Sequence, residues 1–164
     1  TILVMFGDHQ PSDYITNVIT RLTGYDAEAS LEENQKSYLV PYAIWSNYDL
    51  NTDAAAGSAD VADKKEEQTA ADEAKSMTSA NYLGAEVLRM AGVPLSDYHE
   101  FLLKMKERLP VIAAGAYIDS EGTYRTYTDP DEVNEKLLNG YQILQYNHLT
   151  DRKNRVMDLF MGMQ

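Results

Sequence analysis

The residues best suited to chemistry are Asp8 and His9, which follow Gly7 at the end of an apolar run from Thr1 to Phe6. Adjacent side chains of a strand point to opposite faces, but a glycine turn just past the strand end lets a neighbouring carboxylate and imidazole converge. A carboxylate oxygen and an imidazole nitrogen together suit Zn²⁺ or Mn²⁺. The same pair also occurs in ordinary loops, where the aspartate caps a turn and the histidine is solvated. The pair alone leaves both interpretations open.

The run before the pair is apolar and rich in β-branched residues, which is typical of a fully buried parallel strand. The helix expected next carries Ile15, Val18 and Leu22 at helical spacing before Gly24 ends it. A second strand should begin at Pro41 or lie at a sheet edge, because proline cannot donate to a ladder. In open α/β sheets ligands bind beyond the carboxyl ends of the strands, which is where this order places the Asp-His pair.

The rest of the chain predicts further helices and a hairpin, with one solvated interruption. Residues 49–75 contain almost no large apolar side chain, so we expect a solvated, low-complexity excursion there. Polar caps and turns mark the elements that follow: Ser79, Ser96 or Asp97, the turn Asp119–Gly122, and Asp129 before Pro130. Strands interleaved with helices predict an α/β fold.

Composition excludes several classes of function. The 164 residues carry 14 basic and 26 acidic side chains, a net charge of −12, so binding to nucleic acid or to an anionic membrane surface is not expected. Cysteine is absent, which removes disulfides, thiolate metal sites and a cysteine nucleophile. No apolar run approaches the ~20 residues that cross a bilayer, so the sequence predicts a soluble chain.

Five sequence blocks in a fixed order carry a family resemblance. They are VMFGDHQPS, VPYAIWSNYDL, TSANYLGAEVLRMAGVPLSDYHEFL, RLPVIAAGAYID and GYQILQYNHL. Together they span residues 1 to about 149 and resemble the C-terminal half of the lipoteichoic acid synthase-like phosphoglycerol transferases, within the alkaline phosphatase/sulfatase superfamily. The resemblance implies a layered α/β/α fold, of which residues 1–164 form a C-terminal fragment with a partial sheet and flanking helices.

The resemblance also implies a role for the Asp-His pair. In that family the matching residues are two ligands of the catalytic metal, so Asp8 and His9 are the expected ligands of Mn²⁺ or Zn²⁺. A glutamate ligand, the nucleophilic threonine and the substrate-binding residues lie N-terminal to the matched region and have no counterpart here. The implied substrate is a glycerol-phosphate-bearing lipid or polymer, handled at the extracytoplasmic face of the cell membrane.

Two consequences and two alternatives follow. With two ligands and no nucleophile, the chain alone should bind metal weakly and be inactive. A strand that begins the chain should lack a neighbour, which favours self-association through its edge. One alternative is an acidic, non-catalytic interaction module in which Asp8 and His9 form a turn. The other keeps the fold but changes the activity to that of a sulfatase or a phosphonate hydrolase.

Other polar and aromatic residues are weaker candidates. Trp45, Asn47 and Tyr48 follow the second strand, where a substrate could lie, although core packing and turn formation are the simpler expectation. His99 falls in a first helical turn and is expected to be solvated. His148 falls near a helix end, where its interaction with the helix dipole is the simpler expectation.

Overall fold

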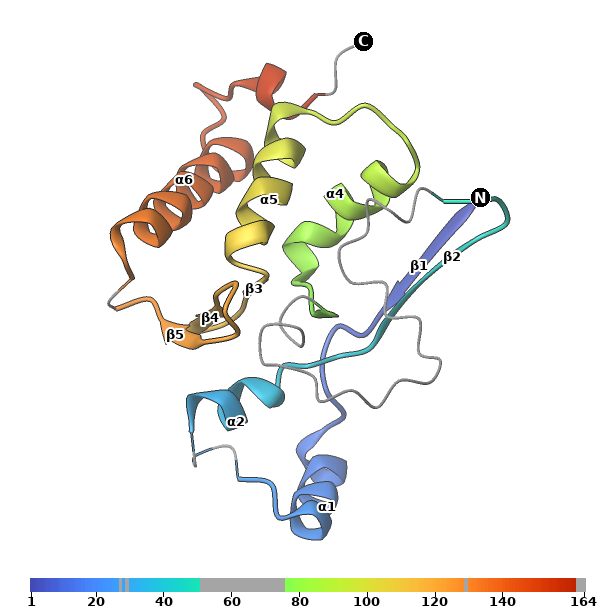
Figure 1. Cartoon of the computed structure of the whole chain (residues 1–164), viewed down its shortest axis with the longest axis vertical. Helices are drawn as coiled ribbons and strands as arrows, with labels where there is room; N and C mark the ends of the chain where they lie inside the picture. Colours follow the sequence, from blue (N-terminus) through green and yellow to red (C-terminus); the bar gives the residue numbers. More distant parts are fainter. Residues whose placement is uncertain (27, 29, 51–75, 129, 162–164) are drawn as a thin grey trace.

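The computed structural model describes residues 1–26, 28, 30–50, 76–128 and 130–161, so most of the predicted excursion at 49–75 lies outside the described residues. The elements run in the order β1 (Ile2–Phe6), α1 (Asp13–Thr23), α2 (Leu31–Lys36), β2 (Tyr42–Ser46), α4 (Ala80–Met90), α5 (Asp97–Arg108), β3 (Val111–Ile112), β4 (Ala116–Ile118), β5 (Tyr124–Thr126), α6 (Glu132–Leu149) and the 3₁₀ turn η2 (Met157–Leu159). Figure 1 shows an N-terminal region, residues 1–50, beside a C-terminal region, residues 76–161, that holds α4, α5 and α6.

The strand β1 pairs with β2 in an antiparallel ribbon, with Ile2 opposite Ser46 and Phe6 opposite Tyr42. The prediction of a fully buried parallel strand is therefore wrong. The chain leaves β1 at Phe6, passes through α1 and α2, and returns to the same end of the ribbon, whereas a parallel partner would have required a crossover to the other end. An apolar run identifies a strand that suits burial, but it does not identify the neighbour that buries it.

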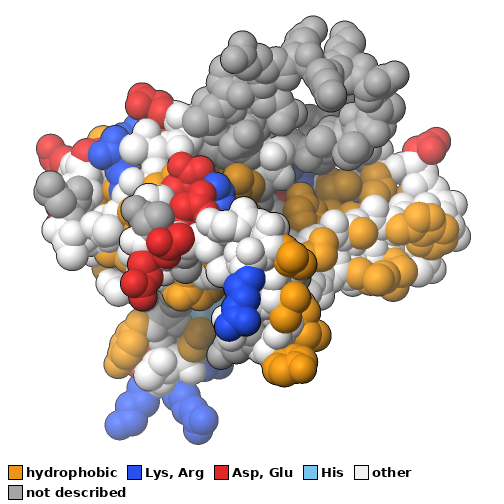
Figure 2. Space-filling model, turned by 90° about the horizontal axis from the view of Figure 1, so that it is seen from below, with side chains coloured by type: hydrophobic (Ala, Val, Ile, Leu, Met, Phe, Trp, Pro, Cys, Tyr) orange, Lys and Arg blue, Asp and Glu red, His pale blue; other side chains and the backbone are white. Residues whose placement is uncertain are grey.

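Neither the ribbon nor α1 buries its apolar side chains among the described residues. Leu3, Met5 and Trp45 lie on one face of the ribbon and are all exposed, as are Ile15 and Leu22 of α1. Figure 2 shows hydrophobic side chains gathered on the side of the molecule that carries the ribbon in Figure 1. The predicted end of α1 is confirmed, because Gly24 has a left-handed backbone (φ 71°).

The second sheet has the order β3-β4-β5 and is antiparallel throughout. The predicted turn between its last two strands is confirmed. The Gly122 N–H donates to the Asp119 carbonyl (3.0 Å), and Gly122 has φ 82°. The Asp119 carboxylate accepts from the N–H groups of Glu121 and Thr123 and from Arg125 Nε. Although burial raises the pKa of Asp119, the bonds from Arg125 and the backbone outweigh it and hold the pKa below its usual value.

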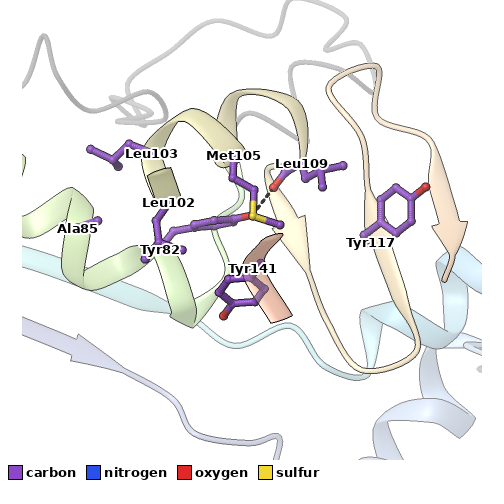
Figure 3. Packing of buried hydrophobic residues seen from close by; sticks show 8 residues of the cluster. All are labelled: Tyr82, Ala85, Leu102, Leu103, Met105, Leu109, Tyr117 and Tyr141. Carbon is purple, nitrogen blue, oxygen red and sulfur yellow. Dashed lines mark hydrogen bonds between the residues drawn. The ribbon is translucent and has the colours of Figure 1, made fainter. Parts of the chain in front are cut away.

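The hydrophobic core lies wholly in the C-terminal region, between the second sheet and the three helices around it (Figure 3). Its members are Tyr82, Ala85, Leu102, Leu103, Met105, Leu109, Tyr117 and Tyr141. The Tyr82 hydroxyl donates to the Leu109 carbonyl (2.8 Å), which satisfies a polar group that is otherwise buried among apolar atoms, and burial raises the pKa of this tyrosine. A buried ion pair between Glu86 of α4 and Lys106 of α5 links the two helices beside this core.

The three helices of the C-terminal region begin close to the predicted positions, but their caps differ in detail. Ser96 caps α5 by accepting from the His99 N–H, as expected. Ser79 precedes α4, but its hydroxyl accepts from the Ile112 N–H (2.6 Å) and so ties the helix to β3. The cap of α6 is Asp131, which accepts from the Val133 and Asn134 N–H groups, whereas the predicted cap, Asp129, lies outside the described residues.

The chain is thus mixed α/β, with two small antiparallel sheets among the described residues. Across that same part of the chain, no helix combines the length and the apolar character that crossing a membrane requires.

Candidate metal site

Gly7 extends the ribbon by one residue and sets the position of the Asp-His pair. Its N–H donates to the Pro41 carbonyl (3.1 Å), and a Cβ atom added to it would lie 3.0 Å from the Val40 Cβ. A side chain at this position would force Val40 to move, so the chain needs glycine here for close approach. At the expected glycine turn, Gly7 therefore lies close to the Val40 side chain, and the chain then bends at Asp8 and His9.

Asp8 and His9 lie side by side beyond the end of β1. The Asp8 Oδ1 and His9 Nε2 atoms are 3.6 Å apart, and the two side chains are 84% and 77% exposed, respectively. The adjacent Gln10 side-chain amide donates to the Leu39 carbonyl, which fastens this bend to the segment before β2. The structure thus brings the two predicted residues together at an accessible position.

A backbone carbonyl contacts the His9 ring. His9 Nδ1 lies 2.6 Å from the Gln10 carbonyl oxygen, and because a carbonyl can only accept, Nδ1 carries the proton. In the neutral ring, Nε2 then carries the lone pair, and Nε2 is the atom that lies near the Asp8 carboxylate. Metal-binding histidines commonly donate their second ring nitrogen to a backbone carbonyl in this way.

The donor separation suits one divalent ion. Two ligands at roughly 2.0–2.2 Å from a tetrahedral ion lie about 3.3–3.6 Å apart, close to the separation observed. The pair stands alone, however. Within the described ranges, no group of three or more His, Asp, Glu or Cys side chains is placed to hold a metal. The residues present fit a metal ion but supply only two of its ligands.

A pocket of about 390 Å³ adjoins Asp8. Phe6, Gly7 and Asp8 form one side of it, the segment 38–40 a second, the start of α4 a third, and the second sheet a fourth. In Figure 1, β1 descends to the level at which α4 begins. No sequence motif indicated this pocket, because its walls come from four segments that are distant along the chain.

The second group of candidates lies elsewhere. Because β1 and β2 are antiparallel, Trp45, Asn47 and Tyr48 fall at the end of the ribbon opposite Asp8. Trp45 and Tyr48 are exposed, so core packing does not account for them, and Asn47 Oδ1 accepts from the Thr1 amino group (2.6 Å). A site formed by the carboxyl ends of both strands is excluded by this pairing.

The other two histidines have local structural partners. His99 Nδ1 lies 2.7 Å from the Ser96 hydroxyl, and partial burial lowers the pKa of this histidine, so its side chain is half-buried rather than freely solvated. His148 stacks on Phe160 with ring centroids 4.2 Å apart. Both side chains therefore help to pack the helices of the C-terminal region.

Comparison with known proteins adds no relative. No family model, curated protein or solved structure matches the chain.

Proposed function

We propose that this chain is part of a metal-dependent phosphoglycerol transferase or phosphodiesterase of the sulfatase superfamily, in which Asp8 and His9 are two ligands of Mn²⁺ or Zn²⁺. The separation of the two donor atoms is the observation that carries the proposal. Asp8 Oδ1 and His9 Nε2 lie 3.6 Å apart at an exposed position, and His9 Nδ1 contacts the Gln10 carbonyl. This separation matches that of two ligands of one tetrahedral ion.

The ordered sequence blocks support the finer part of the proposal. The remaining ligands and the nucleophile would come from polypeptide outside this chain, and β1 would join a larger layered α/β/α sheet. The exposed apolar faces of β1 and α1 are what such a sheet would cover. The substrate would be a glycerol-phosphate-bearing lipid or polymer at the extracytoplasmic face of the membrane.

Each residue of the site would have a defined part. A bound divalent ion neutralises charge on a phosphoryl oxygen and lowers the pKa of a coordinated hydroxyl. Asp8 would contribute a negative, hard oxygen and His9 a neutral nitrogen, while the Gln10 carbonyl would orient the imidazole ring through Nδ1. Gly7 keeps the bend close to Val40 and so fixes where both donors lie.

A non-catalytic interaction module is the second candidate. The observation that favours it is the uncharged, exposed face formed by Leu3, Met5 and Trp45, which suits a protein partner. In that case Asp8 and His9 would form only a turn, and their replacement would leave metal binding unchanged.

Titration of the chain with Mn²⁺, followed by electron paramagnetic resonance, separates the two candidates. We expect weak binding that Asp8→Ala or His9→Ala weakens by roughly tenfold or more, in line with the loss of a ligand. Asp158→Ala, which removes an exposed carboxylate far along the sequence, is the matched control and should change nothing. In the longer enzyme that the resemblance implies, Asp8→Ala should abolish phosphodiester cleavage. Unchanged activity there would contradict the ligand assignment.

A further inference from the structure

The pocket beside Asp8 has walls that are mainly apolar and aromatic. Phe6, Tyr38 and Leu39 line it from the N-terminal region, and Ile118 lines it from β4. All three residues of β4 line the pocket, and one of them, Tyr117, also belongs to the core. Its volume of about 390 Å³ falls within the range of about 300–1,000 Å³ typical of small-molecule sites.

The described part of the pocket interior is uncharged, and a single charged side chain lies at its rim. Asp8 is the only charged residue among the described residues that line it, and no lysine, arginine or histidine joins them. The described residues of the walls therefore offer no cation to an anionic group, and the Asp8 carboxylate repels one unless a metal ion is bound. An anionic head would lie at the rim with the metal, whereas the interior suits an uncharged body.

Size limits what that body can be. A volume of about 390 Å³ equals roughly a dozen water molecules at about 30 Å³ each, and apolar cavities of about 150 Å³ already take up benzene. One ring with a short substituent fits, whereas two long acyl chains do not. Two polar side chains of the lining already have partners, because the Thr78 hydroxyl donates to Glu86 and the Gln35 amide donates to the Ala114 carbonyl. The Tyr117 hydroxyl has no partner among the described residues, so a single polar group on the body could bind there.

We propose that this pocket selects the substrate by holding a compact, uncharged and largely apolar body next to the metal-bound head of an anionic ester. The metal-bound head of the substrate rests on the proposed function. The binding of the apolar body in the pocket does not depend on it. Tyr38, Leu39 and Ile118 would be the specificity-determining residues, since they form the apolar walls.

The test compares three probes by calorimetry. Phenyl phosphate carries both head and body, methyl phosphate carries the head, and benzyl alcohol carries the body alone. With Mn²⁺ present, we expect phenyl phosphate to bind about tenfold more tightly than methyl phosphate, which corresponds to about 1.4 kcal/mol. Benzyl alcohol should bind weakly with or without the metal.

Ala113→Phe fills the pocket from the turn between β3 and β4 and should abolish both the phenyl preference and the binding of benzyl alcohol. Ala91→Phe, at the far end of α4 and outside the pocket lining, is the matched control and should preserve both. Tyr38→Ala, which removes an exposed wall residue, gives a second test if the Ala113 variant does not fold, and should reduce the preference.

The outcomes separate the two proposals. Equal affinity for phenyl and methyl phosphate would contradict the proposed role of the pocket. A preference for phenyl phosphate that survives Ala113→Phe in a folded protein would contradict it as well. If benzyl alcohol binds as expected but Asp8→Ala leaves the Mn²⁺-dependent binding of methyl phosphate unchanged, the pocket stands and the metal assignment fails.

Discussion

The N-terminal and C-terminal regions differ in how they use their apolar residues. Every buried hydrophobic side chain among the described residues lies between Tyr82 and Tyr141, whereas β1, β2 and α1 leave most of theirs exposed. A two-stranded ribbon is at best marginally stable in water unless a third strand or a helix covers it. The C-terminal region therefore supplies most of the stability. The N-terminal region carries the Asp-His pair and the exposed apolar side chains.

The largest expected effect concerns the buried ion pair. Lys106→Met would leave the Glu86 carboxylate buried with only the Thr78 hydroxyl, and should lower the free energy of unfolding by about 3–5 kcal/mol. Replacing Glu86 by Leu in the same protein should restore most of the loss. The matched change in the N-terminal region is Lys36→Met, which breaks the exposed pair with Glu33 and should have almost no effect. Urea denaturation measures all three, and an equal loss at both lysines would contradict the comparison.

Two methionines test the same contrast in apolar packing. Met105 is fully buried and Met5 is 61% exposed. We expect Met105→Ala to cost about 2–5 kcal/mol because it opens a cavity in the core, and Met5→Ala to stay within about 0.5 kcal/mol. Equilibrium denaturation of the two variants decides the point. A large loss at Met5 would mean that the ribbon is covered in solution.

The turn at Asp119 predicts a dependence on pH. Its folded pKa is below the usual value, so the carboxylate contributes stability that is present above about pH 4 and is lost as pH falls through the folded pKa. Asp119→Asn should lower the free energy of unfolding by roughly 1.5–3 kcal/mol at pH 7, through weaker bonds to Arg125 and the backbone. Denaturation curves at pH 7 and pH 3 should show the difference between wild type and variant shrinking in acid. If the difference in free energy of unfolding were the same at pH 7 and pH 3, the effect would come from altered packing and not from the carboxylate charge.

The smallest expected effect is on self-association. The bonds made by Gly7 and Thr1 face β2, so the alternating ladder turns the backbone groups of Val4 to the other edge of β1, with which no described strand pairs. This edge and the neighbouring face carry no charge, and we expect two copies to pair there weakly. Met5→Lys should weaken the dimer by about tenfold or more, while Val93→Lys, an exposed site in the C-terminal region, should not. Sedimentation that shows a monomer over a wide concentration range would contradict the pairing.

The sequence predicted those features whose causes are local. The Asp119–Gly122 turn and the end of α1 at Gly24 depend on a few adjacent residues, and both are confirmed. The juxtaposition of Asp8 and His9 was predicted in the same way, although its glycine acts through contact with Val40.

Features that depend on distant segments were predicted less well. The apolar run at β1 did not reveal its antiparallel partner, and the resulting geometry moves Trp45 away from Asp8. The pocket joins four separated segments, so no spacing in the sequence marks it. The contact of His9 Nδ1 with the Gln10 carbonyl depends on the local path of the backbone and could come only from the structure.

The most direct test of the Asp-His site is nuclear magnetic resonance of the chain during titration with Mn²⁺, which broadens signals near the bound ion. We predict that the imidazole signals of His9 and the amide signals of residues 7–10 broaden first, while those of His99 and His148 stay sharp at the same metal concentration. Broadening that is equal at all three histidines, or that begins in the acidic stretch at 51–75, would contradict the account.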